Sequence, residues 1–198
     1  TQQAKLTAND GTLGNAFGQS VALDADTALI GAARDDEQGN QAGAAYVFVR
    51  TGTSWSQQTK IMANDGGRGD HFGTGVALAD TLAVIGAPGA DAVYPYVRSG
   101  DTWSEQVKRR PGDRQLGTWV AVDGETALVS TLFADDGDTV YVLRRNGVIW
   151  TQEAALTVSG ETGNTLVNSI ALDGNTALIG GVGTVSVFVR TGTGASTT

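Results

Sequence analysis

The sequence predicts an all-β fold, a four-bladed β-propeller built of four-stranded antiparallel blades. Three columns of similar residues keep the same order along the 198-residue chain; two of them recur four times and the third, which begins at a tryptophan, recurs three times. Each copy contains four short apolar runs, and Asp- or Gly-containing turns separate these runs. A four-stranded antiparallel unit that repeats about every 47 residues is typical of a propeller blade. No stretch shows the apolar period of an amphipathic helix.

The three columns mark the second, third and fourth strands of each unit. The second strand reads Thr-Ala-Leu-Ile or a close variant, at residues 27–31, 81–86, 126–130 and 176–180. The third strand ends in arginine and occupies 47–50, 94–98, 140–144 and 187–190. The fourth strand begins at a tryptophan in three units, Trp55, Trp103 and Trp150. Because these tryptophans repeat faithfully, we expect them to pack structurally on the outer strands.

The first strand of each unit precedes a tight turn. The four predicted first strands are 17–23, 72–78, 116–122 and 166–172. Short Asp or Gly turns between apolar runs, as at 24–26 and 123–125, are hairpin signals. We therefore expect one propeller domain, 1–198, with blades at about 16–62, 72–109, 116–156 and 166–190.

The N-terminal segment resembles a fourth strand. Residues 1–6 match 56–61, so we expect residues 1–7 to pair beside 183–190 and to close the ring as the outer strand of the last blade. Closure of this kind removes exposed strand edges. The alternatives are a fragment of a larger ring and two chains that share an eight-bladed ring.

Composition excludes several classes of function. The net charge is −8, which disfavours nucleic acid as a partner because phosphates require a basic face. The chain has no cysteine, so it can form neither disulfides nor thiolate metal sites. No apolar run approaches the length of about 18 residues that a membrane span needs, so no membrane insertion is expected.

A pair of dipeptide and tripeptide motifs points to a family. Phe72-Gly73 is followed by Gly86-Ala87-Pro88, and Phe17-Gly18 by Gly31-Ala32-Ala33, whereas the later two repeats have diverged. The chain therefore resembles the FG-GAP (integrin-α-type) repeat family of β-propellers. The resemblance implies an extracellular or cell-surface module that binds rather than catalyses, with integrin-like cell adhesion among the implied roles.

The resemblance does not extend to calcium. Integrin-type blades often hold calcium in a long Asp-rich loop between the first two strands, but here that connection is too short for six to eight oxygen ligands. We expect no cofactor and no metal at the short turns (Asp24, Asp80, Asp123 and Asp173). Any cation is expected among the longer loops, at Asp35, Asp36, Glu37, Asp135, Asp136 or Asp138.

The candidate ligand-binding residues gather in the loops where propeller ligands usually bind. They are Trp119, Asp35, Asp36, Asp65, Asp70, His71, Asp135 and Asp136. Carboxylates at this density can hydrogen-bond sugar hydroxyls, although Asp is also an ordinary turn residue, and a solvated rim is the favoured interpretation.

Trp119 breaks the fourfold pattern of the innermost strands. The other blades have Ser20, Gly75 and Ser169 at this position. The indole either plugs a narrow axis, which we favour, or offers a stacking surface to a sugar ring.

Catalytic residues are not evident in the repeats. His71 is the only histidine, and no Ser or Cys is placed as its partner. The tripeptide Arg68-Gly69-Asp70 is a weak adhesion signal in a glycine-rich loop. We therefore expect a non-enzymatic extracellular recognition module whose partner is a glycan or a protein, and which can form a homo-oligomer. The alternatives are a polysaccharide-active enzyme with paired carboxylates and a structural assembly unit.

Overall fold

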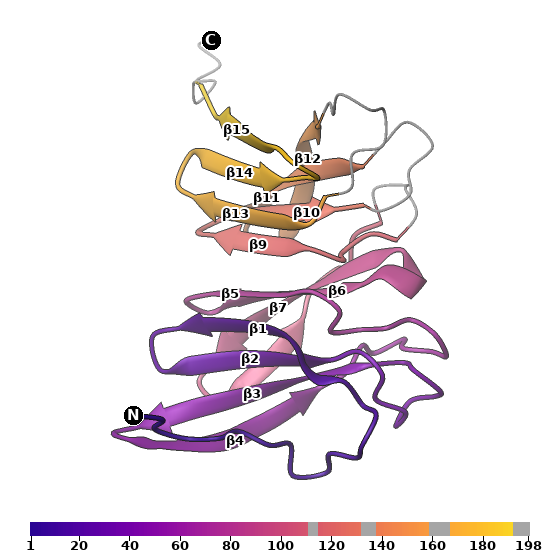
Figure 1. Ribbon diagram of the computed structural model, residues 1–198, viewed down its shortest axis with the longest axis vertical. Coiled ribbons are helices and arrows are strands. Elements are labelled where there is room, and N and C mark those ends of the chain that lie inside the picture. Colours follow the sequence, from indigo (N-terminus) through magenta and orange to yellow (C-terminus); the bar gives the residue numbers. More distant parts are fainter. Residues whose placement is uncertain (111–114, 132–137, 159–166, 192–198) are drawn as a thin grey trace.

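Four antiparallel sheets stack along the longest axis of the molecule (Figure 1). The structure, a computed structural model, describes residues 1–110, 115–131, 138–158 and 167–191. Within them the only helical element is the single 3-10 turn η1 (Pro88–Ala90). The predicted fold class, an all-β four-bladed propeller, is confirmed.

Each blade follows the predicted order of strands. The first blade contains β1 (Phe17–Asp24), β2 (Thr27–Ala32), β3 (Ala44–Thr51) and β4 (Ser54–Ile61). The second contains β5 (Val76–Ala79), β6 (Leu82–Ala87), β7 (Ala92–Ser99) and β8 (Thr102–Glu105). The third contains β9 (Val120–Asp123), β10 (Thr126–Ser130), β11 (Thr139–Asn146) and β12 (Ile149–Thr157). The fourth, as far as it is described, contains β13 (Ser169–Asp173), β14 (Thr176–Gly180) and β15 (Val185–Val189).

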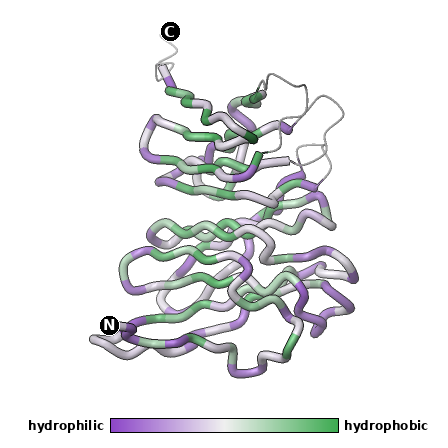
Figure 2. The backbone as a smooth tube through the Cα atoms, viewed as in Figure 1, coloured by the Kyte–Doolittle hydropathy of each residue, from purple (hydrophilic) through white to green (hydrophobic). Residues whose placement is uncertain are grey.

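The middle strands of the first three blades are apolar on both faces because each face is covered, by a neighbouring blade or, on the outer side of the first blade, by the segment that contains Leu6 and Ala8. Every residue of β2 and of β6 is buried. Between the first two blades, Leu29 and Val47 pack against Ile85 and Tyr94. Two further cores lie between the second and third blades and between the third and fourth. Hydrophobic residues accordingly follow the strands, whereas hydrophilic residues gather in the turns (Figure 2).

The glycines of the FG and GAP motifs let neighbouring blades touch through their backbones. A Cβ atom added at Gly31 would lie 2.0 Å from the carbonyl oxygen of Gly73, and one added at Gly86 would lie 1.8 Å from that of Gly117. Gly73 and Gly117 adopt φ values of +90° and +92°, which favour glycine. Each contact joins the GAP glycine of one blade to the FG glycine of the next.

The inner strands of the later blades are shorter than the sequence predicts. The prediction began them at 72, 116 and 166, but β5, β9 and β13 begin at Val76, Val120 and Ser169. In the second and third blades the FG glycines Gly73 and Gly117 have a positive φ; their N–H groups still donate to Gly86 and Ser130 of the next strand, but the regular ladder begins only at Val76 and Val120.

The prediction that the N-terminal strand closes the ring is wrong. Residues 1–8 form no strand, and Leu6 and Ala8 pack against the first blade beside Ile30, Tyr46 and Phe48. The first and fourth blades lie at opposite ends of the stack, so β15 is out of reach of this segment (Figure 1). A strand forms only where a partner edge accepts its backbone hydrogen bonds. Leu6 and Ala8 take the place against the first blade that Ile61 and Ala63 take against the second.

Candidate functional site

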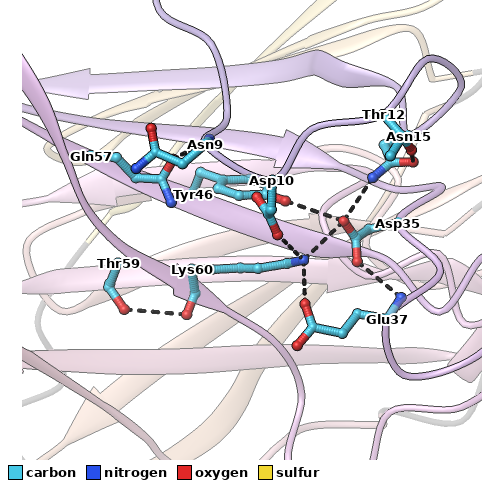
Figure 3. A network of polar contacts seen from close by, with 10 residues as sticks. All are labelled: Asn9, Asp10, Thr12, Asn15, Asp35, Glu37, Tyr46, Gln57, Thr59 and Lys60. Atoms are coloured by element: carbon cyan, nitrogen blue, oxygen red, sulfur yellow. Dashed lines mark hydrogen bonds and ion pairs between the residues drawn. The ribbon is translucent and has the colours of Figure 1, made fainter.

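A lysine surrounded by carboxylates organises the loops beside the first blade (Figure 3). Lys60, near the end of β4, donates through Nζ to Asp10 Oδ2 at 2.7 Å, Asp35 Oδ2 at 3.0 Å and Glu37 Oε2 at 2.6 Å. Asp35 also accepts hydrogen bonds from Asn15 Nδ2 at 2.9 Å and from the Tyr46 hydroxyl at 3.1 Å. We call these six residues the Lys60 cluster.

The Lys60 cluster is satisfied internally. The Lys60 side chain is 14% exposed and that of Asp35 only 3%. Burial opposes the charged form of Lys60, but hydrogen bonds with Asp10, Glu37 and Asp35 outweigh it and raise the pKa of this lysine. The hydrogen bond from Lys60 is the main cause that lowers the pKa of Asp10. Burial raises the pKa of Tyr46, which therefore stays a neutral donor.

The second blade repeats the arrangement in a simpler form. Lys108 pairs with Asp65, which also accepts a hydrogen bond from the Tyr94 hydroxyl at 3.1 Å. The neighbouring Asn64 N–H donates to Glu105 Oε2 at 2.9 Å, as Asn9 N–H does to Gln57 Oε1. An Asn-Asp-Gly loop is thus tied to the outer strand of the following blade. Two of the predicted site residues, Asp35 and Asp65, take part in these ion pairs and hydrogen bonds.

The other predicted loop residues form turns. Asp36 Oδ1 accepts a hydrogen bond from Gln41 N–H at 2.7 Å, and Asp70 Oδ2 accepts one from Gly67 N–H at 2.8 Å. His71 has a φ of +55°, and its Nδ1 lies 3.3 Å from the Ala33 carbonyl oxygen. The structure does not bring Asp36 and Asp70 into the Lys60 cluster.

The third blade contributes one described acidic residue to the predicted set. Asp138 is 2% exposed, and its Oδ2 accepts a hydrogen bond from Val167 N–H at 2.7 Å. Asp135 and Asp136 lie outside the described residues.

The carboxylates of the short turns link consecutive blades. Asp24 Oδ2 accepts a hydrogen bond from Asp80 N–H at 2.5 Å, and Asp123 Oδ2 accepts one from Gly174 N–H at 2.6 Å. Among the described residues no group of three or more His, Cys, Asp or Glu side chains is arranged to hold a metal ion. The carboxylates that do converge, Asp10, Asp35 and Glu37, surround an ammonium group instead.

Trp119 lines a groove between the inner strands of three blades. The groove has a volume of about 420 Å³ and is lined by Gln19, Ser20, Val21, Thr74, Gly75, Val76, Thr118, Trp119 and Val120. The Trp119 backbone N–H donates to Ser130 Oγ at 2.9 Å, and the residue is 40% exposed. This exposure favours the stacking-surface interpretation of Trp119 over that of a plug. The sequence pointed to Trp119, but not to Gln19 or to the two threonines.

Four repeated blades that pack through apolar cores define a β-propeller repeat protein. Residues 1–48 and 55–101 match the model of the FG-GAP repeat. The first two blades are therefore FG-GAP repeats, which confirms the family expected from the sequence. FG-GAP propellers are binding or structural modules, and such repeats are typical of extracellular proteins. The described residues include no helix long and apolar enough to cross a bilayer.

Two solved structures are similar to the chain. A crystal structure of a protein from Lactobacillus plantarum is 17% identical, with a TM-score of 0.48 over 88% of this chain and 67% of that one. Hydrazine synthase of Kuenenia stuttgartiensis is 13% identical, with a TM-score of 0.52 over 94% of this chain and 53% of that one. The chain thus spans about half the length of the hydrazine synthase chain, and this likeness concerns the fold alone. No curated protein shows significant similarity to the sequence.

Proposed function

We propose that this protein is a non-enzymatic extracellular recognition module that binds a neutral carbohydrate in the groove beside Trp119. The observation that carries the proposal is the 40% exposed indole at a position of the inner strands where the other blades have serine or glycine. Exposed large aromatic side chains that line a groove are typical anchors for ligands.

The lining of the groove matches the chemistry of a sugar. The indole supplies a flat apolar surface for the C–H face of a pyranose ring. The hydroxyls of Ser20, Thr74 and Thr118 and the amide of Gln19 supply hydrogen-bonding groups around it. Because Ser20 Oγ donates to the Gly73 carbonyl oxygen at 2.8 Å, its lone pairs are left to accept from a ligand hydroxyl. None of the nine lining residues is charged, which favours a neutral ligand.

The positions of the carboxylates favour a binding role for the groove over glycoside hydrolysis. Glycosidases need two carboxyl groups on either side of the scissile bond, one as a proton donor and one as a base or nucleophile. None of the nine described lining residues carries a carboxyl group. Asp10, Asp35 and Glu37 are close together, but all three are ion-paired with Lys60.

The test is a glycan array followed by calorimetric titration of the best neutral ligand. We expect Trp119→Ala to weaken binding at least tenfold, because the stacking surface is lost. We expect its thermal midpoint to stay within about 1 °C of the parent, because an exposed side chain leaves no cavity.

Trp103→Ala is the matched control, since Trp103 is a repeated tryptophan of an outer strand, remote from the groove lining. It is expected to retain full binding. If Trp119→Ala binds normally but melts much earlier, the indole is a plug and the proposal is wrong. An array without any bound glycan, together with capture of a protein ligand, would also reject a carbohydrate ligand.

A further inference from the structure

The outer face of the fourth blade is apolar and is not covered by any described residues. Val185, Val187 and Val189 are 67%, 62% and 61% exposed, and Leu178 is 43% exposed. Of the equivalent positions in the first blade, Ala45, Val47 and Leu29 are fully buried and Val49 is partly buried, because the second blade covers them. The fourth blade therefore presents the surface that an FG-GAP blade uses to bind the next blade.

The opposite end of the stack shows the complementary face. Val21 and Leu23 of β1 are 69% and 66% exposed, whereas their equivalents Val76 and Leu78 of β5 are 7% and 8% exposed. The difference arises because the first blade covers β5, while in the described residues no blade precedes β1. The two end faces thus correspond to the two sides of one blade–blade interface.

The two glycines that would make the backbone contact of that interface lie at opposite ends of the stack, without a partner blade in the described part of the chain. The FG glycine Gly18 has a φ of +88°, like Gly73 and Gly117, yet nothing lies within 4 Å of an added Cβ. At the other end, the three atoms nearest to a Cβ added at Gly180, the equivalent of the GAP glycine, all belong to Ser169 of its own blade. Gly18 and Gly180 are therefore the two halves of the contact that Gly86 and Gly117 make between blades.

A hydrogen bond from an arginine of one blade to a threonine of the preceding blade also indicates that the fourth blade lacks a following neighbour among the described residues. Arg98 Nη1 of the second blade donates to Thr27 Oγ1 of the first at 2.9 Å, and Arg190 Nη2 of the fourth blade donates to Thr126 Oγ1 of the third at 3.4 Å. Both threonines are buried, at 6% and 4% exposure. Thr176, their equivalent in the fourth blade, is exposed.

We propose that a second copy of this chain covers these faces. The fourth blade of each copy packs on the first blade of the other, and two copies form a closed ring of eight blades, within the usual size of a propeller. Residues 1–7 of the second copy then run along β15 as an outer strand, which the described residues of the fourth blade do not supply. They already lie against the first blade in the place of a preceding fourth strand, and they repeat its sequence.

The mass of the protein in solution tests the assembly. Light scattering after gel filtration is expected to give about 41 kDa, twice the 20.3 kDa of one chain, at low and high salt alike because the interface is apolar. Val187→Asp and Val21→Asp are each expected to give about 20 kDa. Val148→Asp, at a 62% exposed turn residue, is the control and is expected to stay dimeric.

A mixture of the two variants shows which faces meet. Val187→Asp supplies an intact first blade and Val21→Asp an intact fourth blade, so their mixture retains one good interface and is expected to recover the dimer mass. A monomeric parent protein would overturn the proposal. A dimer that survives Val21→Asp, or parent species larger than a dimer, would also overturn it.

An engineered disulfide between two copies tests how residues 1–7 pair with β15, independently of the mass measurement. Val47 pairs with Thr59 between β3 and β4, and the equivalent pair across the proposed interface is Val187 with Ala4 of the second copy. The chain has no cysteine, so in the double variant Ala4→Cys with Val187→Cys no other thiol can form a disulfide. Oxidation is expected to give a covalent dimer on a non-reducing gel, and Ala4→Cys with Val148→Cys is expected to give none. A bond within one chain, or no bond, would overturn the proposal.

Discussion

Gly86→Ala is expected to destabilise the protein by about 3 kcal/mol or more, the upper range for an overpacked contact. The new Cβ would lie 1.8 Å from the carbonyl oxygen of Gly117, a backbone atom that no rotamer change can move. Relief requires the second and third blades to separate, and Val84, Val93 and the third-blade residues in their shared core then lose contact. Urea denaturation followed by circular dichroism measures the loss.

Gly67→Ala is the control for this substitution. Gly67 has no positive φ, and its Cβ would meet only Asp70 Oδ2 at 3.8 Å, so we expect a change within about 0.5 kcal/mol. If Gly86→Ala unfolds at the same urea concentration as Gly67→Ala, the blades do not approach through their backbones.

Lys60→Met is expected to cost about 3 kcal/mol. The substitution leaves Asp35 with a side chain only 3% exposed and no cation, and it leaves Asp10 and Glu37 as like-charged neighbours. Removing one partner of a buried ion pair costs about 3–5 kcal/mol, and the hydrogen bonds from Asn15 and Tyr46 keep the expected loss at the lower end. Thermal and urea denaturation at pH 7 measure it.

Lys108→Met is the matched control in the next blade. Among the described residues Lys108 forms an ion pair with Asp65 alone, and the two side chains are 28% and 50% exposed. Such a pair contributes about 1 kcal/mol or less. Equal losses for Lys60→Met and Lys108→Met would show that the Lys60 cluster adds nothing beyond a surface ion pair.

The difference between the parent protein and Lys60→Met is expected to shrink in acid. The pKa of Asp10 is lowered by Lys60, so its contribution to stability is complete above the unfolded-state pKa of about 3.9 and is lost as the pH falls through the lower folded value. Denaturation midpoints measured between pH 7 and pH 3 should converge below about pH 4. A constant difference would contradict the role given to Asp10.

The sequence predicted the blades well because each strand is fixed by local repetition. Strand order, hairpin turns and the buried second strands follow from residues close together in the chain. The path of residues 1–8 does not, because their motif is the same whether they complete the last blade of their own chain or of another. The repeat shows which kind of strand the segment is, but not which edge it meets.

The Lys60 cluster was predicted only in part. The sequence singled out Asp35 and Glu37 as acidic loop residues, but it missed Lys60, which neutralises them. Asp10, Asp35 and Lys60 are far apart in the chain and meet only when an outer strand packs beside two loops. One signal was available: Asn9-Asp10-Gly11 and Asn64-Asp65-Gly66 are each followed by a lysine near the end of the next outer strand, Lys60 in β4 and Lys108 just beyond β8.

The separation of the core into clusters between successive blades gives the protein an unusual form of cooperativity. Each interface is built from two neighbouring sheets only, so stability is passed along the chain as nearest-neighbour couplings rather than through one shared centre. A blade inside the stack is stabilised twice and a blade at either end once. Amide exchange should therefore be slowest in β6 and β10 and fastest in β14 and β15, a gradient that association at the ends would flatten.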